Sequence, residues 1–194
     1  MTRPRPEFRW PRPGIAAAAA LALSMGCTSA EPPALGPGPD AIDASDESVR
    51  IKGLAPHLRI HRQRGGEVEL LRDGAMAHEG DLVQLSYMAA GNRYGVVVSL
   101  DGGGGVTLHH PAQAAAEPAV VSRGEHALDH AYELDGAVSY ERFVFVTSGD
   151  EPIEVSAVLT AAQRLAARGE AARHSALPLP GRWRQSSITL DKRP

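Results

Sequence analysis

Apolar and polar residues alternate along four stretches of the chain, and alternation with a period of two predicts half-buried β-strands. In one stretch Val83, Leu85 and Tyr87 share a face, and Gln84 and Ser86 share the other. The denser stretch that follows is rich in valine, which packs well on a pleated surface. The four predicted strands cover residues 58–61, 82–87, 94–100 and 106–109.

The last two of these strands are separated by Asp101 and a run of glycines, 102–105. Glycine reaches the positive φ values of tight hairpins, so we expect the chain to reverse here. A phosphate-binding loop is the alternative, but such a loop leads into a helix and carries a lysine. This run leads into a predicted strand and contains no lysine.

The second half of the domain predicts two more strands and then a helix. The strands are His130–Leu134 and Arg142–Val146, and Asp135-Gly136 marks the start of the turn between them. Apolar residues then recur at helical spacing over about 155–168, a segment rich in alanine. Gly169 is expected to end that helix, and residues 181–190 return to an extended pattern.

These elements predict one mainly β domain. We expect an antiparallel β-sandwich or open barrel with one packed α-helix at about 155–168. No internal repeat is visible, and residues 49–194 have the length of a single domain.

The first 26 residues have the pattern of a secretory signal peptide. Four arginines precede an uncharged apolar run, 15–23, that ends in small residues. The run is shorter than the roughly 20 apolar residues that a transmembrane helix needs. A disordered, alanine-rich tail is the alternative interpretation.

Cys27 is the only cysteine, so it cannot form an internal disulfide. Leu23–Cys27 resembles the lipobox of bacterial lipoproteins, in which the cysteine becomes an acylated first residue. The resemblance implies a lipid anchor on Cys27, although Ser24 stands where the pattern has an aliphatic residue. The resemblance to lipoproteins also implies that Thr28 after the cysteine favours the outer membrane, with the domain facing the periplasm or the cell surface. Plain secretion, with cleavage between Ser24 and Glu31, is the alternative.

Residues 27–48 are predicted to form a flexible acidic linker. They contain several prolines and glycines, five acidic residues, no basic residue and no aromatic residue. Such a segment buries too little apolar surface to offset its ordering entropy. Without residues 1–26, which hold four arginines and one glutamate, the formal net charge changes from −3 to −6. We therefore expect no nucleic-acid partner, because that binding depends on neutralising phosphates.

The histidines are the main candidates for chemistry. His109 is next to His110, and His126 and His130 lie four residues apart with Glu125 and Asp129 nearby. Histidines at that spacing ligate metals on helices, but the pattern here favours a strand. No Gly-x-Ser-x-Gly nucleophile motif occurs. We expect no catalytic residues, no cofactor and no metal site.

Trp183 lies between Arg182 and Arg184. A tryptophan with this flanking charge can anchor a partner at a surface, so these three residues are candidate partner contacts. Packing of the indole against the helix is the favoured alternative.

Several of these strand-and-turn segments resemble the bacterial family called domain of unknown function 4384. The resemblance is carried by residues 80–87, 93–102, 106–111, 128–134 and 141–148. It implies a non-enzymatic β module, of the kind found as accessory envelope or regulatory domains and sometimes attached to protein kinases. It implies no catalytic residues.

Three functions follow as hypotheses. The leading one is a membrane-tethered module that binds a protein or glycan partner in the cell envelope. The second is a periplasmic hydrolase that uses a metal or a His/Asp pair. The third is a structural envelope lipoprotein without a specific partner.

Overall fold

The computed structural model describes residues 54–136 and 139–193. The predicted signal peptide, Cys27 and the acidic linker lie outside the described residues.

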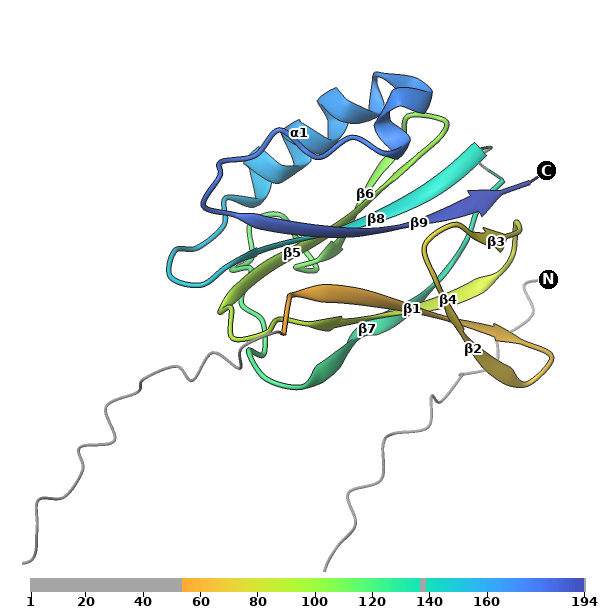
Figure 1. Ribbon diagram of the computed structural model, residues 1–194, viewed down its shortest axis with the longest axis horizontal. Helices are drawn as coiled ribbons and strands as arrows, with labels where there is room; N and C mark the ends of the chain where they lie inside the picture. Colours follow the sequence, from red (N-terminus) through yellow and green to blue (C-terminus); the bar gives the residue numbers. More distant parts are fainter. Residues whose placement is uncertain (1–53, 137–138, 194) are drawn as a thin grey trace, which may run out of the picture. The chain divides into compact units, whose positions relative to one another are not determined.

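Nine strands form two sheets that face each other as a sandwich (Figure 1). Sheet A has the order β2-β1-β4-β7, and sheet B has the order β3-β9-β8-β5-β6. The strands of sheet A are β1 (His57–Arg64), β2 (Glu67–Leu71), β4 (Leu82–Met88) and β7 (Glu125–Glu133). The strands of sheet B are β3 (Ala75–Ala77), β5 (Tyr94–Asp101), β6 (Val106–His110), β8 (Ser139–Ser148) and β9 (Arg184–Lys192). The predicted mainly β fold is confirmed, as a sandwich rather than an open barrel.

Every predicted strand is present, with three corrections. Strands β2 and β3 were not predicted, and β7 begins at Glu125 instead of His130. The short β3 pairs parallel to β9, so sheet B is not purely antiparallel. Strands β7 and β8 belong to different sheets, so the two strands on either side of the predicted turn at Asp135-Gly136 do not pair with each other.

One hydrophobic core lies between the two sheets. Ile60 and Leu85 from sheet A meet Phe143 and Phe145 from sheet B, and all four side chains are buried. The Phe145 ring fits because it packs over Gly95 of the neighbouring strand: a Cβ at position 95 would stand 2.6 Å from the ring. Gly95 thus has a packing role that alternation alone does not indicate.

A second core lies between sheet B and the helical layer. Helix α1 (Val155–Ala166) buries Val158, Ala162 and Leu165 against Val98 and Leu100 of β5, among others. The helix ends two residues before the predicted boundary, and Gly169, at φ +59°, leads into the 3-10 helix η1 (Gly169–Arg173). The predicted single packed helix is confirmed.

The glycine run forms the predicted hairpin between β5 and β6. The Asp101 carboxylate accepts hydrogen bonds from the amides of Gly103 and Gly105, at 2.7 and 2.9 Å. A Cβ at position 105 would lie 2.3 Å from that carboxylate, and Gly104 has a φ of +90°. The glycines therefore serve the turn itself.

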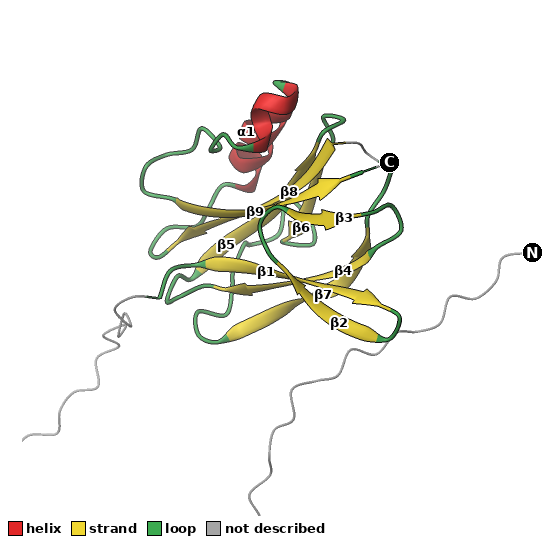
Figure 2. Cartoon of the chain, turned by 45° about the vertical axis from the view of Figure 1, so that its right-hand side comes forward, coloured by secondary structure: helices red, strands yellow, loops and turns green. Residues whose placement is uncertain are grey.

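The layers leave the two sheets in different surroundings. Sheet B lies between sheet A and the helical layer, whereas the drawn helices and strands leave the other face of sheet A open (Figure 2). We call this surface the open face of sheet A; it carries the outward side chains of β1, β2, β4 and β7. Within residues 54–136 and 139–193, no helix has the length and apolarity to cross a membrane.

Candidate functional site

A polar cluster occupies the open face of sheet A where β1, β4 and β7 run side by side. It consists of Arg59 and His61 on β1, Ser86 on β4 and Glu125 on β7, and we call it the open-face cluster. The Arg59 guanidinium donates to Glu125 Oε2, and the Ser86 hydroxyl donates to Glu125 Oε1 at 2.6 Å. The His61 Nε2 atom lies 3.6 Å from the same Oε1. One carboxylate thus connects three strands.

The cluster fixes the charge of Glu125. Burial alone would raise the pKa of this carboxyl, but the hydrogen bond from Ser86 and the charge of Arg59 outweigh burial, so its pKa is lowered. Glu125 is therefore an anion at neutral pH. Arg59 balances it with 43% of its side chain exposed, so both charges are available to a docking molecule.

The open-face cluster does not have the geometry of a Ser-His-acid triad. In a triad the acid binds Nδ1 of the histidine and the serine binds Nε2. Here Ser86 Oγ and Glu125 both face Nε2 of His61, at 3.4 and 3.6 Å. The Ser86 hydroxyl also points its proton at the carboxylate, so His61 does not activate it.

An apolar margin on β2 lies beside the cluster. Register places Leu70 opposite His61 and Val68 opposite Gln63, so both apolar side chains share the open face. Val68 and Leu70 are 47% and 49% exposed, and they are two of the four large hydrophobic residues exposed in the described part of the chain. Apolar surface next to pairable charges is typical of protein-binding surfaces.

A second polar group is buried inside the sandwich on the inner face of sheet B. His109 Nε2 lies 3.0 Å from the Ser99 hydroxyl, and Ser99 also hydrogen-bonds Glu141. Lys192 Nζ lies 3.4 Å from Glu141 and 2.7 Å from Asp135. These side chains connect β6, β5, β8 and β9 in the order in which the strands pair.

The Ser99–His109 end of this inner group is closed to solvent, whereas the Asp135 side chain at the other end is 69% exposed. Ser99 is 2% exposed and His109 is 9% exposed. Burial lowers the pKa of His109 to about 4 and raises the pKa of Glu141. A neutral histidine beside a serine resembles a catalytic pair in its residues, but a substrate carbonyl cannot reach a hydroxyl in this position. The contacts instead pair buried polar side chains across four strands, while His109 Nδ1 is buried without a hydrogen-bond partner.

The histidines that drew attention in the sequence do not form one site. His126 Nε2 lies 2.7 Å from the Arg123 carbonyl, and its ring lies beside Tyr87. Asp129 and His130 are exposed on β7. In the described ranges there is no group of three metal-ligating side chains.

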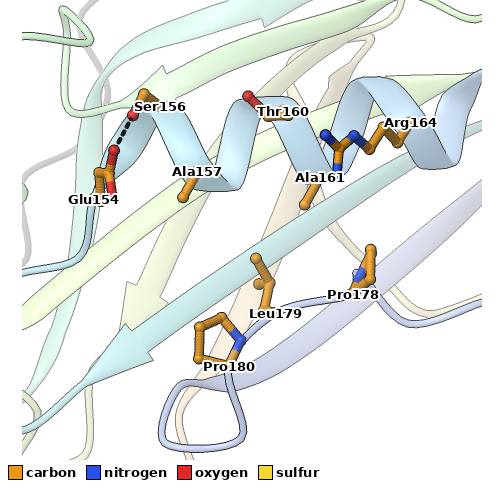
Figure 3. A pocket seen from close by; sticks show the side chains of 9 residues that line it. All are labelled: Glu154, Ser156, Ala157, Thr160, Ala161, Arg164, Pro178, Leu179 and Pro180. Carbon is orange, nitrogen blue, oxygen red and sulfur yellow. Dashed lines mark hydrogen bonds between the residues drawn. The ribbon is translucent and has the colours of Figure 1, made fainter.

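A groove of about 350 Å³ runs between α1 and the segment 178–180 (Figure 3). Leu179 and Pro180 face Ala157 and Ala161 across it, and Arg164 stands at the end away from Glu154. The groove is lined by no histidine, and at one end the Ser156 hydroxyl donates to Glu154 Oε1 at 2.7 Å. Both of these side chains are exposed, and the middle of the groove can accept an apolar group.

The three residues of the predicted partner contact differ in exposure, although the Arg182 guanidinium lies over the Trp183 ring, 5.7 Å from its centroid. Trp183 is 7% exposed and belongs to the core beneath α1. Arg182 is exposed, and its Nε atom lies 3.1 Å from Glu151 Oε2. Arg184 is exposed at the start of β9. The indole packs inside the fold, so a contact at this position would fall to the two arginines, and that contact stays a prediction.

Sequence reasoning missed the open-face cluster and the inner group. Ser86 and Glu125 are 39 residues apart, and Ser99 and His109 are 10 apart on paired strands. For the open-face cluster the available signal was the set of polar positions within the alternating strands, since these mark the solvent side of a sheet. Ser99 and His109 face the interior, so this signal does not apply to them. Only strand order brings those positions together.

A scan of protein-family models finds no match to this chain, and searches of curated proteins and of solved structures also return no match.

Proposed function

We propose that this chain is an exported, lipid-anchored module of the cell envelope that binds a protein partner and performs no catalysis of its own. The observation that supports this most directly is the open face of sheet A. It offers an ion pair, a histidine and two half-exposed apolar side chains on a rigid sheet. Rigid presentation lowers the entropy cost of binding.

A protein partner fits this face better than a glycan does. Sugar rings bind by stacking on exposed aromatic side chains, and no phenylalanine, tyrosine or tryptophan in 54–136 or 139–193 is exposed. The charges of Arg59 and Glu125 and the methyl groups of Val68 and Leu70 suit another polypeptide surface instead.

The proposed location in the cell envelope rests on the sequence. The basic and apolar start, Cys27 and the acidic linker favour an outer-membrane lipoprotein whose domain stands away from the bilayer. The resemblance to the family of domain of unknown function 4384 points to the same class of accessory module. A hydrolase is less favoured, because the serine–histidine contacts at Ser86 and Ser99 are respectively misdirected and buried.

Site-specific photocrosslinking in cells tests the docking face. A photoreactive residue replaces Gln63, which lies on the open face, or Gln163, which is exposed on α1. We expect position 63 to give a discrete adduct with one protein and position 163 to give none. The adduct protein is then purified, and Arg59→Glu should weaken its binding to the full chain at least tenfold.

Two results would reject the docking face. One is an adduct from position 163 with none from position 63. The other is unchanged affinity in both Arg59→Glu and Leu70→Asp, each with a native thermal unfolding profile.

Mass spectrometry of the mature protein tests the proposed lipid anchor separately. We expect a first residue at Cys27 that carries acyl chains, and loss of membrane association in Cys27→Ser. A mature chain that begins between Ser24 and Glu31 without lipid would show plain secretion and reject the anchor.

A further inference from the structure

Strand β2 is an open edge of sheet A. It stands last in the sheet order, and four of its five residues are exposed. At the opposite edge, β7 carries a register shift that interrupts pairing, and in sheet B the edge strand β3 has three residues. Regular exposed edges of this kind are templates for strand addition.

The side chains of β2 specify what a matching strand must carry. Val68 and Leu70 point to the open face, and Glu67 and Glu69 point to the other side. Glu69 already accepts a hydrogen bond from Arg62 at 2.7 Å, and 56% of its side chain remains exposed. A matching strand therefore needs apolar residues at alternate positions, with basic residues between them.

The chain itself contains this pattern at residues 49–52, Val-Arg-Ile-Lys, which lie outside the described residues. We propose that residues 49–52 of a second copy of this chain add to β2 as an antiparallel strand. The register pairs Val49 with Leu70, Arg50 with Glu69, Ile51 with Val68 and Lys52 with Glu67. Both apolar pairs then lie on the open face, and both ion pairs lie on the opposite side.

The reach of the chain requires a second copy. In this register Lys52 lies level with Arg64, because Glu67 pairs with Arg64. His57, where β1 begins, is seven residues away along the strand and two strand spacings to the side, a distance of about 25 Å. The five residues from Lys52 to His57 span at most about 18 Å. The same chain therefore cannot fill its own edge in this register.

Disulfide trapping between two separately purified full chains tests the proposal. Both carry Cys27→Ser, so that the introduced thiols are the only ones; one also carries Arg50→Cys and the other, with a size tag, Glu69→Cys. Directly opposite residues in an antiparallel pair lie close enough for a disulfide. We expect a mixed 50–69 disulfide at least tenfold more abundant than the disulfide of Arg50→Cys with Thr160→Cys on α1.

The pattern of products identifies the occupant of the edge. Dominant 69–69 disulfides would show that β2 pairs with β2 and would overturn the proposal. A 50–69 product no more abundant than the 50–160 control would also overturn it. When both cysteines are placed in one chain, a disulfide within that chain would show pairing in the same copy and would contradict the register.

Sedimentation equilibrium of the full Cys27→Ser chain gives an independent measurement. We expect self-association that Lys52→Glu weakens at least threefold and that Glu67→Lys weakens by a similar factor. The double variant with both changes should recover the original affinity, because the pair is restored with its charges exchanged. A monomer at every concentration would overturn the proposal. The docking face is tested separately, because an adduct of position 63 with a different protein, rather than with a second copy of this chain, does not depend on self-association.

Discussion

Sheet B is buried on both faces, whereas sheet A is buried on one, and their strands differ accordingly. In β8 the nine residues from Tyr140 to Ser148 are buried with a single exception. In β1 buried and half-buried residues alternate over the first seven positions. The sequence of a strand that is covered on both faces is a nearly continuous apolar run. In a strand that is covered on one face, apolar and polar residues alternate.

The comparison also explains where polar residues stand. In sheet B the polar side chains of Ser99, His109 and Arg142 are all buried and rely on internal partners. In sheet A the charges of Arg59 and Glu125 stay partly exposed on the open face. The helical layer therefore covers the outer face of sheet B, and the open face of sheet A keeps charged side chains partly exposed.

The largest expected contrast is between two leucines on the outer faces of the two sheets. Leu100 is fully buried beneath α1, and Leu70 is 49% exposed on the open face. Leu100→Ala should lower the free energy of unfolding by about 2–5 kcal/mol, because it leaves a cavity. Leu70→Ala should change it by less than about 0.5 kcal/mol. Urea unfolding of both variants measures the difference.

Equal losses in the two variants would contradict the assignment of an open face. Such a result would mean that another part of the chain covers Leu70.

The sequence predicted most of this architecture because the two burial patterns are local. Alternation located β1 and β4, the valine-rich run located β5, and the change of period located α1. Strand β2 was not predicted because four of its five residues are exposed, so its sequence shows no buried apolar face. Strand β3 has three residues, which is too few for a period to be visible.

A second contrast is between two arginines. The buried Arg142 guanidinium donates to the carbonyls of Ala172 and Ser175 and to Ser187 Oγ. Arg142→Met should cost about 2–3 kcal/mol, since it leaves buried carbonyls without donors. Arg59→Met on the open face removes only an exposed ion pair and should cost less than about 1 kcal/mol. Chemical denaturation compares the two, and a cost below about 1 kcal/mol for Arg142→Met would show that these hydrogen bonds contribute little to stability.

The third prediction concerns pH and the inner face of sheet B. Burial lowers the pKa of His109 to about 4 from an ordinary value of 6.5. Between these values the unfolded chain binds the proton and the folded chain does not, so acidification favours unfolding. From pH 7 to pH 5 this histidine should remove about 2 kcal/mol of stability.

The measurement is the difference between the native chain and His109→Gln, because Glu141 titrates in the same group and opposes the trend. Burial raises the pKa of Glu141, so the folded protein binds this proton more readily than the unfolded chain does. Protonation of Glu141 therefore stabilises the folded protein as the pH falls. The variant should lose less stability than the native chain over the same pH interval. Parallel pH profiles for the two proteins would show that His109 is not the source.

The candidate site was less predictable than the fold for a physical reason. Arg59 and Glu125 are 66 residues apart, and they meet only because β4 lies between β1 and β7. Alternation placed Ser86 on the polar side of β4, but it carried no information about which strands would flank it. Strand order depends on long-range packing, which a local pattern does not record.

The smallest predicted loss of stability concerns a residue of sheet A that points to the open face but is buried. Gln84 points outward from β4, yet it is 5% exposed, and its amide donates to the Leu128 carbonyl at 2.6 Å where β7 shifts register. Gln84→Ala should cost about 1–2 kcal/mol, because that carbonyl loses its donor. Gln63→Ala, at an outward position of β1, should change stability by less than about 0.5 kcal/mol. Thermal or urea unfolding measures both losses of stability. If the two losses are equal, the irregularity in β7 does not depend on Gln84, and the open face tolerates substitution equally at both positions.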